Sequence, residues 1–392
     1  MASPVDSPST RHCFHRISPS DIRDSWSGRM DGDILEDIAR QLSAVEVALF
    51  LCLASRAHCL IETTRNYVDD LAKELTLISS NTFDLSSCIV DCCAATSIED
   101  IHDEILTQDA RNFQSRPPYV RGNTESSSNI SVYMGPRDRS RSPVPNTPAD
   151  DVNVVNIVIA KNFNLVEDDV QVQALQLMRT RNLATEAGIL HAPADFLFVP
   201  LVVRDGDLLD PPLRTHLSEH LLVSHFHDPE DGYVYLEENE WFSDGQYSTS
   251  SVIHKSKAKK QQRAKIDEMI LNKLREASES VTTSAEVVRY IQDIVVFLRL
   301  SRAVAGGISA KSNNQFAQFA QLLAPIHGID YLTPSIVALA ARKVFRHRIV
   351  VAKPEDDRSL QYGSDLGAVS QVLDNVTPDS ILDGVLALEP PI

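Results

Sequence analysis

The stretch HCLIETTRNYVDDLA, residues 58–72, holds the pattern that decides the fold of this chain. Its first five residues form a short apolar run, typical of a buried strand. A helical stretch with Leu71, Leu75 and Ile78 on one face follows, and a second strand-like run covers residues 87–91. The order of strand, helix and strand is the repeating unit of α/β proteins.

The same alternation continues on both sides of this stretch. Residues 31–56 show the apolar period of one helix, and residues 152–160 form a β-branched run of the kind buried in a parallel sheet. A helix is predicted from about 168 to 181, and another apolar run covers residues 195–203. Strands that alternate with helices in this way predict a three-layer α/β domain.

From about residue 264 to 350 the pattern changes to helices alone. Four amphipathic stretches cover residues 265–277, 284–300, 313–328 and 333–349. Thr333 and Pro334 predict an N-cap followed by proline in the first helical turn. The sequence therefore predicts a second, all-helical domain.

Segments rich in Ser, Pro, Arg and Lys separate these parts and set the expected boundaries. The predicted organisation is a disordered arm, an α/β core with a disordered insertion over residues 109–150, a basic loop, a helical domain and a C-terminal tail. These parts cover residues 1–28, 29–239, 240–263, 264–352 and 353–392 respectively.

Composition excludes several classes of function. The chain of 392 residues has 54 acidic and 37 basic residues, a net charge of −17, which is the wrong sign for a nucleic-acid partner. No apolar run reaches the ~18 residues of a membrane span, and the first residues lack the apolar segment of a signal peptide. The sequence thus predicts a soluble protein of the cytoplasm or nucleus, with no membrane partner. All six cysteines lie within the first 93 residues in no zinc pattern, so reduced thiols are expected.

Three sequence segments resemble segments of the MoxR and magnesium-chelatase I-subunit branch of the AAA+ ATPases. Residues 58–72 resemble its first strand, phosphate loop and helix, and residues 157–181 resemble its acidic strand with the following helix. Residues 307–349 resemble its lid. The resemblance implies a three-layer αβα, P-loop-like core with a mostly parallel sheet, followed by a small all-α lid domain. It also implies ATP and Mg²⁺ as cofactors.

The chemistry of the phosphate loop departs from this family. Such a loop needs glycines whose N–H groups converge on the phosphates, a lysine, and a hydroxyl on Mg²⁺. The chain has no glycine between Gly32 and Gly122, and Asp69 and Asp70 stand where the lysine and the hydroxyl belong. A carboxylate ~4 Å from a phosphate costs on the order of 4 kcal/mol at an effective dielectric of ~20. We therefore expect neither cofactor to bind.

Other positions that the family uses for catalysis also lack the expected residues. The acidic strand should end in Asp-Glu, but Lys161 and Asn162 follow it, and Lys311 replaces the arginine of the lid. The vestigial nucleotide pocket implied by the resemblance consists of Thr63, Arg65, Asn66, Asp69, Asp70, Lys161, Asn162 and Lys311. None of these residues is expected to be catalytic.

Three functions follow as hypotheses. The first is a degenerate AAA+ protein that does not hydrolyse ATP and acts as an interaction or assembly module, with a protein partner or by self-assembly through its AAA+ faces. The alternative is an ATP-binding ATPase subunit of magnesium-chelatase type, which would support metal insertion or partner remodelling. The third is a zinc hydrolase, because His216, Glu219 and His220 spell H-x-x-E-H. No third zinc ligand is identified in the sequence, so unligated histidines are favoured over a metal site.

Overall fold

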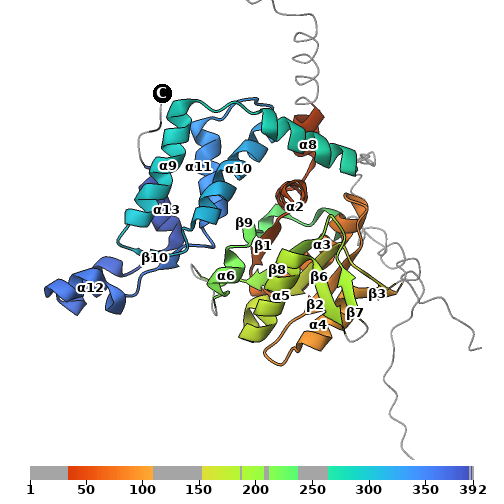
Figure 1. Cartoon of the computed structure of the whole chain (residues 1–392), viewed down its shortest axis with the longest axis horizontal. Helices are drawn as coiled ribbons and strands as arrows, with labels where there is room; N and C mark the ends of the chain where they lie inside the picture. Colours follow the sequence, from red (N-terminus) through yellow and green to blue (C-terminus); the bar gives the residue numbers. More distant parts are fainter. Residues whose placement is uncertain are drawn as a thin grey trace, which may run out of the picture. The chain divides into compact units, whose positions relative to one another are not determined.

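The computed structural model describes residues 34–108, 152–185, 188–206, 212–236, 264–387 and 390 (Figure 1). The chain divides into two compact units. One unit, the α/β unit, is Arg56–Ser256, and the other, the helical unit, joins Met1–Ser55 to Lys257–Ile392. The predicted arm (1–28), insertion (109–150) and basic loop (240–263) lie outside the described residues.

A five-stranded sheet forms the centre of the α/β unit. Its strands lie in the order β2-β5-β8-β1-β9, and every neighbouring pair is parallel. The strands are β1 (His58–Thr63), β2 (Ser87–Asp91), β5 (Ile157–Lys161), β8 (Leu197–Val203) and β9 (Leu221–Phe226). β1 and β8 are almost entirely buried, which explains why they appear in the sequence as continuous apolar runs.

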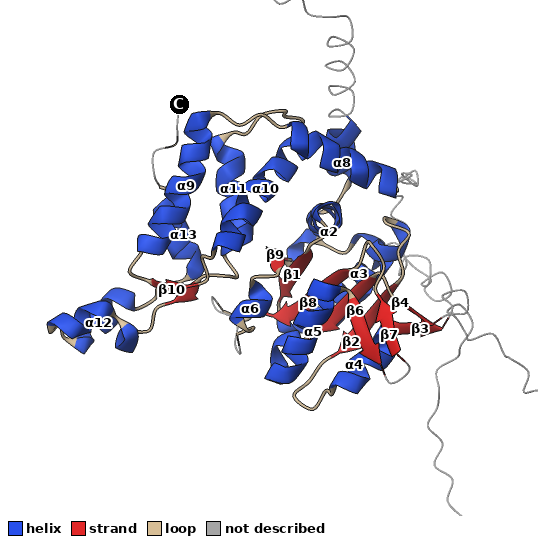
Figure 2. Ribbon diagram, viewed as in Figure 1, coloured by secondary structure: helices blue, strands red, loops and turns tan. Residues whose placement is uncertain are grey.

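Helices cover both faces of this sheet (Figure 2). α4 (Ile98–Ile105) and α5 (Asp168–Thr180) share one hydrophobic cluster with sheet residues such as Val158 and Phe198. α3 (Val68–Asn81) contacts β2, β5 and β8, but its buried side chains are not part of that cluster. α3 therefore packs on the opposite face, and the prediction of a three-layer αβα unit is confirmed.

Two antiparallel strand pairs extend this unit, and neither was predicted. β3 (Leu106–Gln108) pairs with β4 (Val152–Val154), and β6 (Asn182–Thr185) pairs with β7 (Gly188–His191). The prediction of one continuous strand over 152–160 is wrong, because the chain leaves β4 and enters the main sheet only at β5. Asn156 lies at this break, where its backbone N–H and its side chain both hydrogen-bond to Ser86.

Short helical turns follow three of the strands among the described residues of the α/β unit: η1 (Arg65–Tyr67) follows β1, η3 (Phe163–Leu165) follows β5, and η4 (Pro229–Asp231) follows β9. A further turn, α6 (Thr215–Ser218), precedes β9.

The helical unit begins with two helical segments where the sequence predicted one helix over 31–56. Residues 34–41 are helical, and α2 (Ala44–Ser55) starts again after Ser43. The Ser43 hydroxyl accepts from Glu46 N–H, and the Glu46 carboxylate accepts from Ser43 N–H, which is a capping box. This cap ends the first segment and starts the second.

Four of the remaining helices follow the predicted periodicity, namely α8 (Glu268–Ser280), α9 (Ala285–Leu300), α10 (Ala310–Ile326) and α11 (Pro334–Phe345). Two more, α12 (Leu366–Leu373) and α13 (Pro378–Leu386), lie in the segment expected only as a C-terminal tail and were not predicted. Thr333 caps α11 by accepting from Ile336 N–H, with Pro334 in the first turn, so this predicted cap is confirmed. A short ribbon, β10 (Val304–Gly306) with β11 (Val350–Val351), was not predicted. Two single turns, η5 (Pro354–Asp356) and η6 (Arg358–Tyr362), precede α12.

Two expectations from composition can be compared with the described part of the chain. None of its helices combines the length and the apolar character that a membrane crossing requires. Its five cysteines are free thiols, and Cys52, Cys59 and Cys92 are buried, as predicted.

Candidate functional site

The carboxyl ends of the five parallel strands meet at one edge of the sheet, where α/β proteins bind their ligands. Of the eight residues assigned to the vestigial pocket, seven lie at this edge, either at the last position of β1 or β5 or on the segments that follow these strands. The eighth, Lys311, is an exposed residue in the first turn of α10, in the helical unit.

The segment between β1 and α3 is too short and too regular for a phosphate loop. Thr64 is extended, and the next three residues form the turn η1, closed by Tyr67 N–H donating to the carbonyl of Thr64. No residue of this segment has a positive φ, since the non-glycine residues with positive φ lie elsewhere in the described chain. The backbone therefore does not form the concave nest of N–H groups that holds phosphates. Val68, at the start of α3, is buried, and Tyr67 is 39% exposed.

A lysine bridges two carboxylates at the centre of the site. Nζ of Lys161, at the end of β5, lies 2.7 Å from Oδ1 of Asp69 and 3.0 Å from Oδ2 of Asp91. Asp91 ends the neighbouring strand and is directly opposite Lys161 in the sheet register. The resemblance implies a lysine at position 69 and an acid at the end of β5, whereas this chain has the opposite charge at each position, and the two side chains pair with each other.

The pair shifts the pKa of both partners toward the charged forms. The hydrogen bond and the charge of Lys161 lower the pKa of Asp69 below its usual value. Burial alone would lower the pKa of Lys161, but its bonds to Asp69 and Asp91 outweigh burial and raise it. The lysine side chain is only 12% exposed, whereas both carboxylates are more than 70% exposed. The lysine is thus held in its charged form between them.

Most of the other residues of the predicted pocket also make contacts within the chain. Nε of Arg65 lies 3.2 Å from Asp205, and Asp70 lies 3.3 Å from Lys73. The buried Thr63 hydroxyl donates to the carbonyl of His227 at 3.2 Å. Asn162 adopts a left-handed conformation with a φ of 52°, and its N–H donates to Leu201 at the end of β8. Asn66 is exposed.

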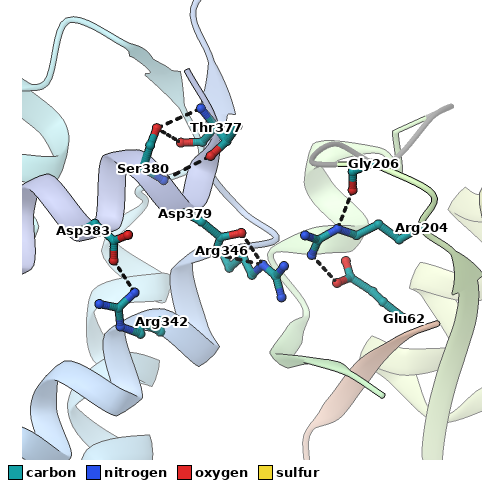
Figure 3. A network of polar contacts seen from close by, with 9 residues as sticks. All are labelled: Glu62, Arg204, Gly206, Arg342, Arg346, Thr377, Asp379, Ser380 and Asp383. Atoms are coloured by element: carbon teal, nitrogen blue, oxygen red, sulfur yellow. Dashed lines mark hydrogen bonds and ion pairs between the residues drawn. The ribbon is translucent and has the colours of Figure 1, made fainter. Parts of the chain in front are cut away.

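Sequence reasoning missed a second ion pair at the same edge, between Glu62 and Arg204. Nη1 of Arg204 lies 3.1 Å from Glu62 Oε2, and its Nε donates to the carbonyl of Gly206 at 2.8 Å (Figure 3). The guanidinium lies over the ring of Phe226 at 5.5 Å. Both charged side chains are at least 88% covered. Glu62 lies near the end of β1 and Arg204 directly follows β8, a placement that would have predicted this pair had the two strands been recognised as neighbours.

The H-x-x-E-H string does not form the arrangement that zinc peptidases use. α6 ends at Ser218, so His216 and His220 do not share one face of a continuing helix. Nδ1 of His220 lies 3.0 Å from the carbonyl of His216. Within the described residues, no three His, Cys, Asp or Glu side chains are grouped so that they could hold a metal ion.

Comparisons with known proteins support the architecture. The sequence model of the AAA lid domain family matches residues 297–365. The protein named maintenance of telomere capping protein 2 of Lachancea thermotolerans is 32% identical over 112 residues, which are 27% of this chain and 39% of that protein. The chain thus spans less than half the length of this relative.

A solved structure extends the comparison to nearly the whole chain. A candidate ATPase from Cytophaga hutchinsonii aligns with a TM-score of 0.59 over 95% of this chain and 98% of its own, at 14% identity. Similarity at this level of identity concerns the fold alone. The parallel sheet order, the following helices and the lid match agree with one another, and by its fold this chain is an AAA+-like protein with an α/β core and an AAA lid domain.

Proposed function

We propose that this chain is a degenerate AAA+ protein of the MoxR and magnesium-chelatase I type, which does not hydrolyse ATP and acts as an interaction or assembly module. The observation that carries the proposal is Lys161 held between Asp69 and Asp91. In this arrangement the positive charge that should attract a nucleotide is already neutralised by the chain itself.

The charge balance of the edge supports the same conclusion. Its ion pairs contain five carboxylates but four cations, which leaves a net charge of −1. The carboxylates are Glu62, Asp69, Asp70, Asp91 and Asp205, and the cations are Arg65, Lys73, Lys161 and Arg204. A triphosphate site needs a surplus of positive charge or a bound metal, because electrostatic attraction provides most of its affinity. This edge offers no such surplus.

Metal binding at the same place would carry an additional cost. To ligate Mg²⁺, Asp69 and Asp91 would have to release Lys161, whose side chain is mostly buried, and its ammonium would lose both partners. An uncompensated charge in a buried position costs several kcal/mol. The family's nucleotide chemistry therefore has no support from this site, whereas the scaffold of the fold is intact.

Calorimetric titration of the full chain with ATP in excess Mg²⁺ tests the proposal. We expect no saturable binding with a Kd below about 1 mM, corresponding to less than ~4 kcal/mol of binding free energy. The Lys161→Asp variant should bind ATP no more tightly than the natural chain, since it removes a cation from this edge and adds a carboxylate. Tight binding of ATP by the natural chain, with turnover, would instead support the ATPase subunit of magnesium-chelatase type.

A further inference from the structure

The main sheet has two edge strands, β2 and β9, and they differ in burial. Five of the six residues of β9 are buried. In β2, Ser87, Cys88 and Ile89 are only partly buried, although α3 and α4 both contact this strand. Because these helices cover the two faces of the sheet, the remaining exposure of β2 is at its outer edge. An exposed edge strand presents a row of backbone groups to a further strand.

The pairing of β2 with β5 identifies these backbone groups. In a parallel pair, alternate residues direct both their N–H and their C=O toward the same neighbour. Ile157 N–H donates to the carbonyl of Ser86 at 2.9 Å, and Cys92 N–H donates to the carbonyl of Lys161 at 3.1 Å. The even-numbered residues from 86 to 92 therefore face β5, in agreement with the register of the two strands.

The odd-numbered residues Ser87, Ile89 and Asp91 face away from β5. Among the described residues, no backbone–backbone hydrogen bond reaches the N–H or C=O of these three residues. β2 therefore offers three donors and three acceptors in one row. Addition of a strand to such an edge is one of the ways in which proteins bind extended peptides.

Charge decides which extended segment fits this edge. Residues 65–105, from η1 to the end of α4, contain nine acidic residues against Arg65 and Lys73. β5 adds Lys161, and α5, on the same face as α4, adds two acids and one arginine. These elements together have eleven acids and four cations, a net charge of −7. Three of the four cations are already paired with acids of the chain.

The acids lie on both sides of β2. The nine within residues 65–105 are Asp69, Asp70, Glu74, Asp84, Asp91, Glu99, Asp100, Asp103 and Glu104. His102 of α4 adds little positive charge at neutral pH, because burial lowers its pKa. An edge strand surrounded by acids attracts a cationic segment and repels an acidic one.

We propose that the outer edge of β2 binds an extended partner segment in which β-branched residues alternate with Lys or Arg. The backbone of the segment would pair with Ser87, Ile89 and Asp91 as a sixth strand, and its cations would compensate the acids of α3 and α4. A second copy of this chain is the less suitable occupant, because it brings the same acidic edge and a net charge of −17. The inference rests on the proposed role as an interaction module and identifies the chemistry of its partner.

Fluorescence anisotropy with three labelled model peptides tests the binding. The probes are an alternating Thr/Lys peptide, a Thr/Glu peptide of the same length, and the Thr/Lys peptide with methylated backbone nitrogens, which keeps the charge but cannot donate. Each is titrated with the full chain without nucleotide. We expect the Thr/Lys peptide to bind at least tenfold more tightly than either of the other two.

Hydrogen exchange resolved to single residues tests the place of binding. In the free chain we expect fast exchange at Ile89 and Asp91, and slow exchange at Cys88 and Val90, whose N–H groups face β5. The Thr/Lys peptide at saturation should slow exchange at Ile89 and Asp91 at least tenfold and leave Cys88 and Val90 unchanged. Attraction by charge alone would not produce this alternation.

Variants separate the backbone from the charge. Ile89→Pro removes one outward N–H, which an edge strand tolerates, and should weaken peptide binding at least tenfold. Asp103→Asn/Glu104→Gln should weaken it about threefold and reduce its salt dependence. The matched control Glu276→Gln/Glu279→Gln removes the same charge from exposed positions of α8 and should leave the binding unchanged. Circular dichroism of each variant shows whether the fold is kept, and the exchange measurement needs no variant.

Four results would overturn the inference. They are equal affinity for the Thr/Lys peptide and its methylated form, unchanged exchange at Ile89 and Asp91 with peptide, slow exchange at both residues in the free chain, and self-association of the unliganded chain that Ile89→Pro abolishes. The third would show that another segment of this chain covers the edge, and the fourth that a second copy does. ATP binding would contradict the proposed function while leaving the peptide results intact, so the two failures can be told apart.

Discussion

At the level of single residues, the proposal depends on the ion pair between Asp69 and Lys161, whose charges are the reverse of those that the AAA+ resemblance implies. Asp69 alone would repel a phosphate, and Lys161 alone would be a poorly solvated cation at the end of a buried strand. In the folded chain Nζ of Lys161 lies 2.7 Å from Asp69 and 3.0 Å from Asp91, so the cation is compensated and one negative charge remains. Each of these two residues is understandable only in the presence of the other, so we regard Asp69 and Lys161 as a coupled pair.

The first prediction concerns the stability of this pair. Lys161→Met should lower the free energy of unfolding at pH 7 by roughly 1 kcal/mol, since both carboxylates are largely exposed to water and salt. Urea denaturation measures this change, and a double-mutant cycle with Asp69→Asn isolates the pair. An effect of Lys161→Met that persists in full in the Asp69→Asn and Asp91→Asn background would contradict the pairing.

The dependence of stability on pH follows from the shifted pKa values. Because folding lowers the pKa of Asp69, its contribution is present above the ordinary value of 3.8 and is lost as the pH falls below it. Because folding raises the pKa of Lys161, its contribution is present below 10.5 and is lost as the pH rises through the folded value. Between pH 6 and 3 the natural chain should lose more stability than Lys161→Met. Parallel urea curves at both pH values provide the test.

A third prediction at this scale concerns Gly307 in the helical unit. Its φ is +95°, and a Cβ added there would lie 1.7 Å from the carbonyl oxygen of Arg348. Gly307→Ala should therefore cost at least ~2 kcal/mol. Gly306→Ala is the matched control, since nothing lies within 4 Å of its added Cβ. Equal melting temperatures for the two variants would show that this backbone approach is not a constraint.

At the level of elements, periodicity identified the parts that depend on burial alone. The strand over 87–91 and the helices now seen as α3 and α5 agree with the sequence prediction to within a few residues. Periodicity failed at two breaks, each of which depends on side-chain hydrogen bonds that periodicity does not detect. Before β5 the side chain of Asn156 hydrogen-bonds to Ser86, and between the first two helical segments the carboxylate of Glu46 accepts from Ser43 N–H. The two antiparallel strand pairs were missed because their strands have only three or four residues each, too few to show alternation.

Prediction of the candidate site from the sequence was limited in a similar way. The sequence identified its residue types, but the Lys161 bridge joins residues 70 and 92 positions apart, and such a contact needs the strand order as well. The strand order was not predicted from the residues. The Glu62 and Arg204 pair was missed for this reason too.

One long side chain fixes the carboxyl end of α2. Arg275 of α8 donates from Nε to the carbonyl of Ala54 at 2.7 Å and from Nη2 to that of Leu53 at 3.0 Å. These carbonyls have no partner within their own helix. Arg275→Ala should lower the free energy of unfolding by roughly 2 kcal/mol and increase hydrogen exchange in α2. Arg289→Ala, at an 84% exposed site, should have little effect. Similar exchange in both variants would contradict this role.

At the level of the whole molecule, the chain has an AAA+-like fold, and we propose that the usual ligand edge of this fold no longer binds nucleotide. The parallel sheet and the lid are present, while side chains at the carboxyl edge of the sheet form ion pairs with one another. Two physical obstacles then stand against a nucleotide: the charge of the edge and the shape of the η1 backbone. The two obstacles can be separated experimentally. The side chains determine the charge of the edge, whereas the absence of glycines determines the shape of the η1 backbone.

The exchanged variant Asp69→Lys/Lys161→Asp restores the charges that the AAA+ resemblance expects without changing the backbone. Lys161→Asp alone should be destabilised by roughly 2 kcal/mol, since it leaves carboxylates at 69, 91 and 161 close together. The double variant should recover most of that loss, because a lysine again lies between two acids. It should still fail to bind ATP and Mg²⁺ below about 1 mM, since the turn at 65–67 has no N–H nest for the phosphates. Micromolar binding by this variant would show that charge exchange alone disables the site, and that the backbone is competent.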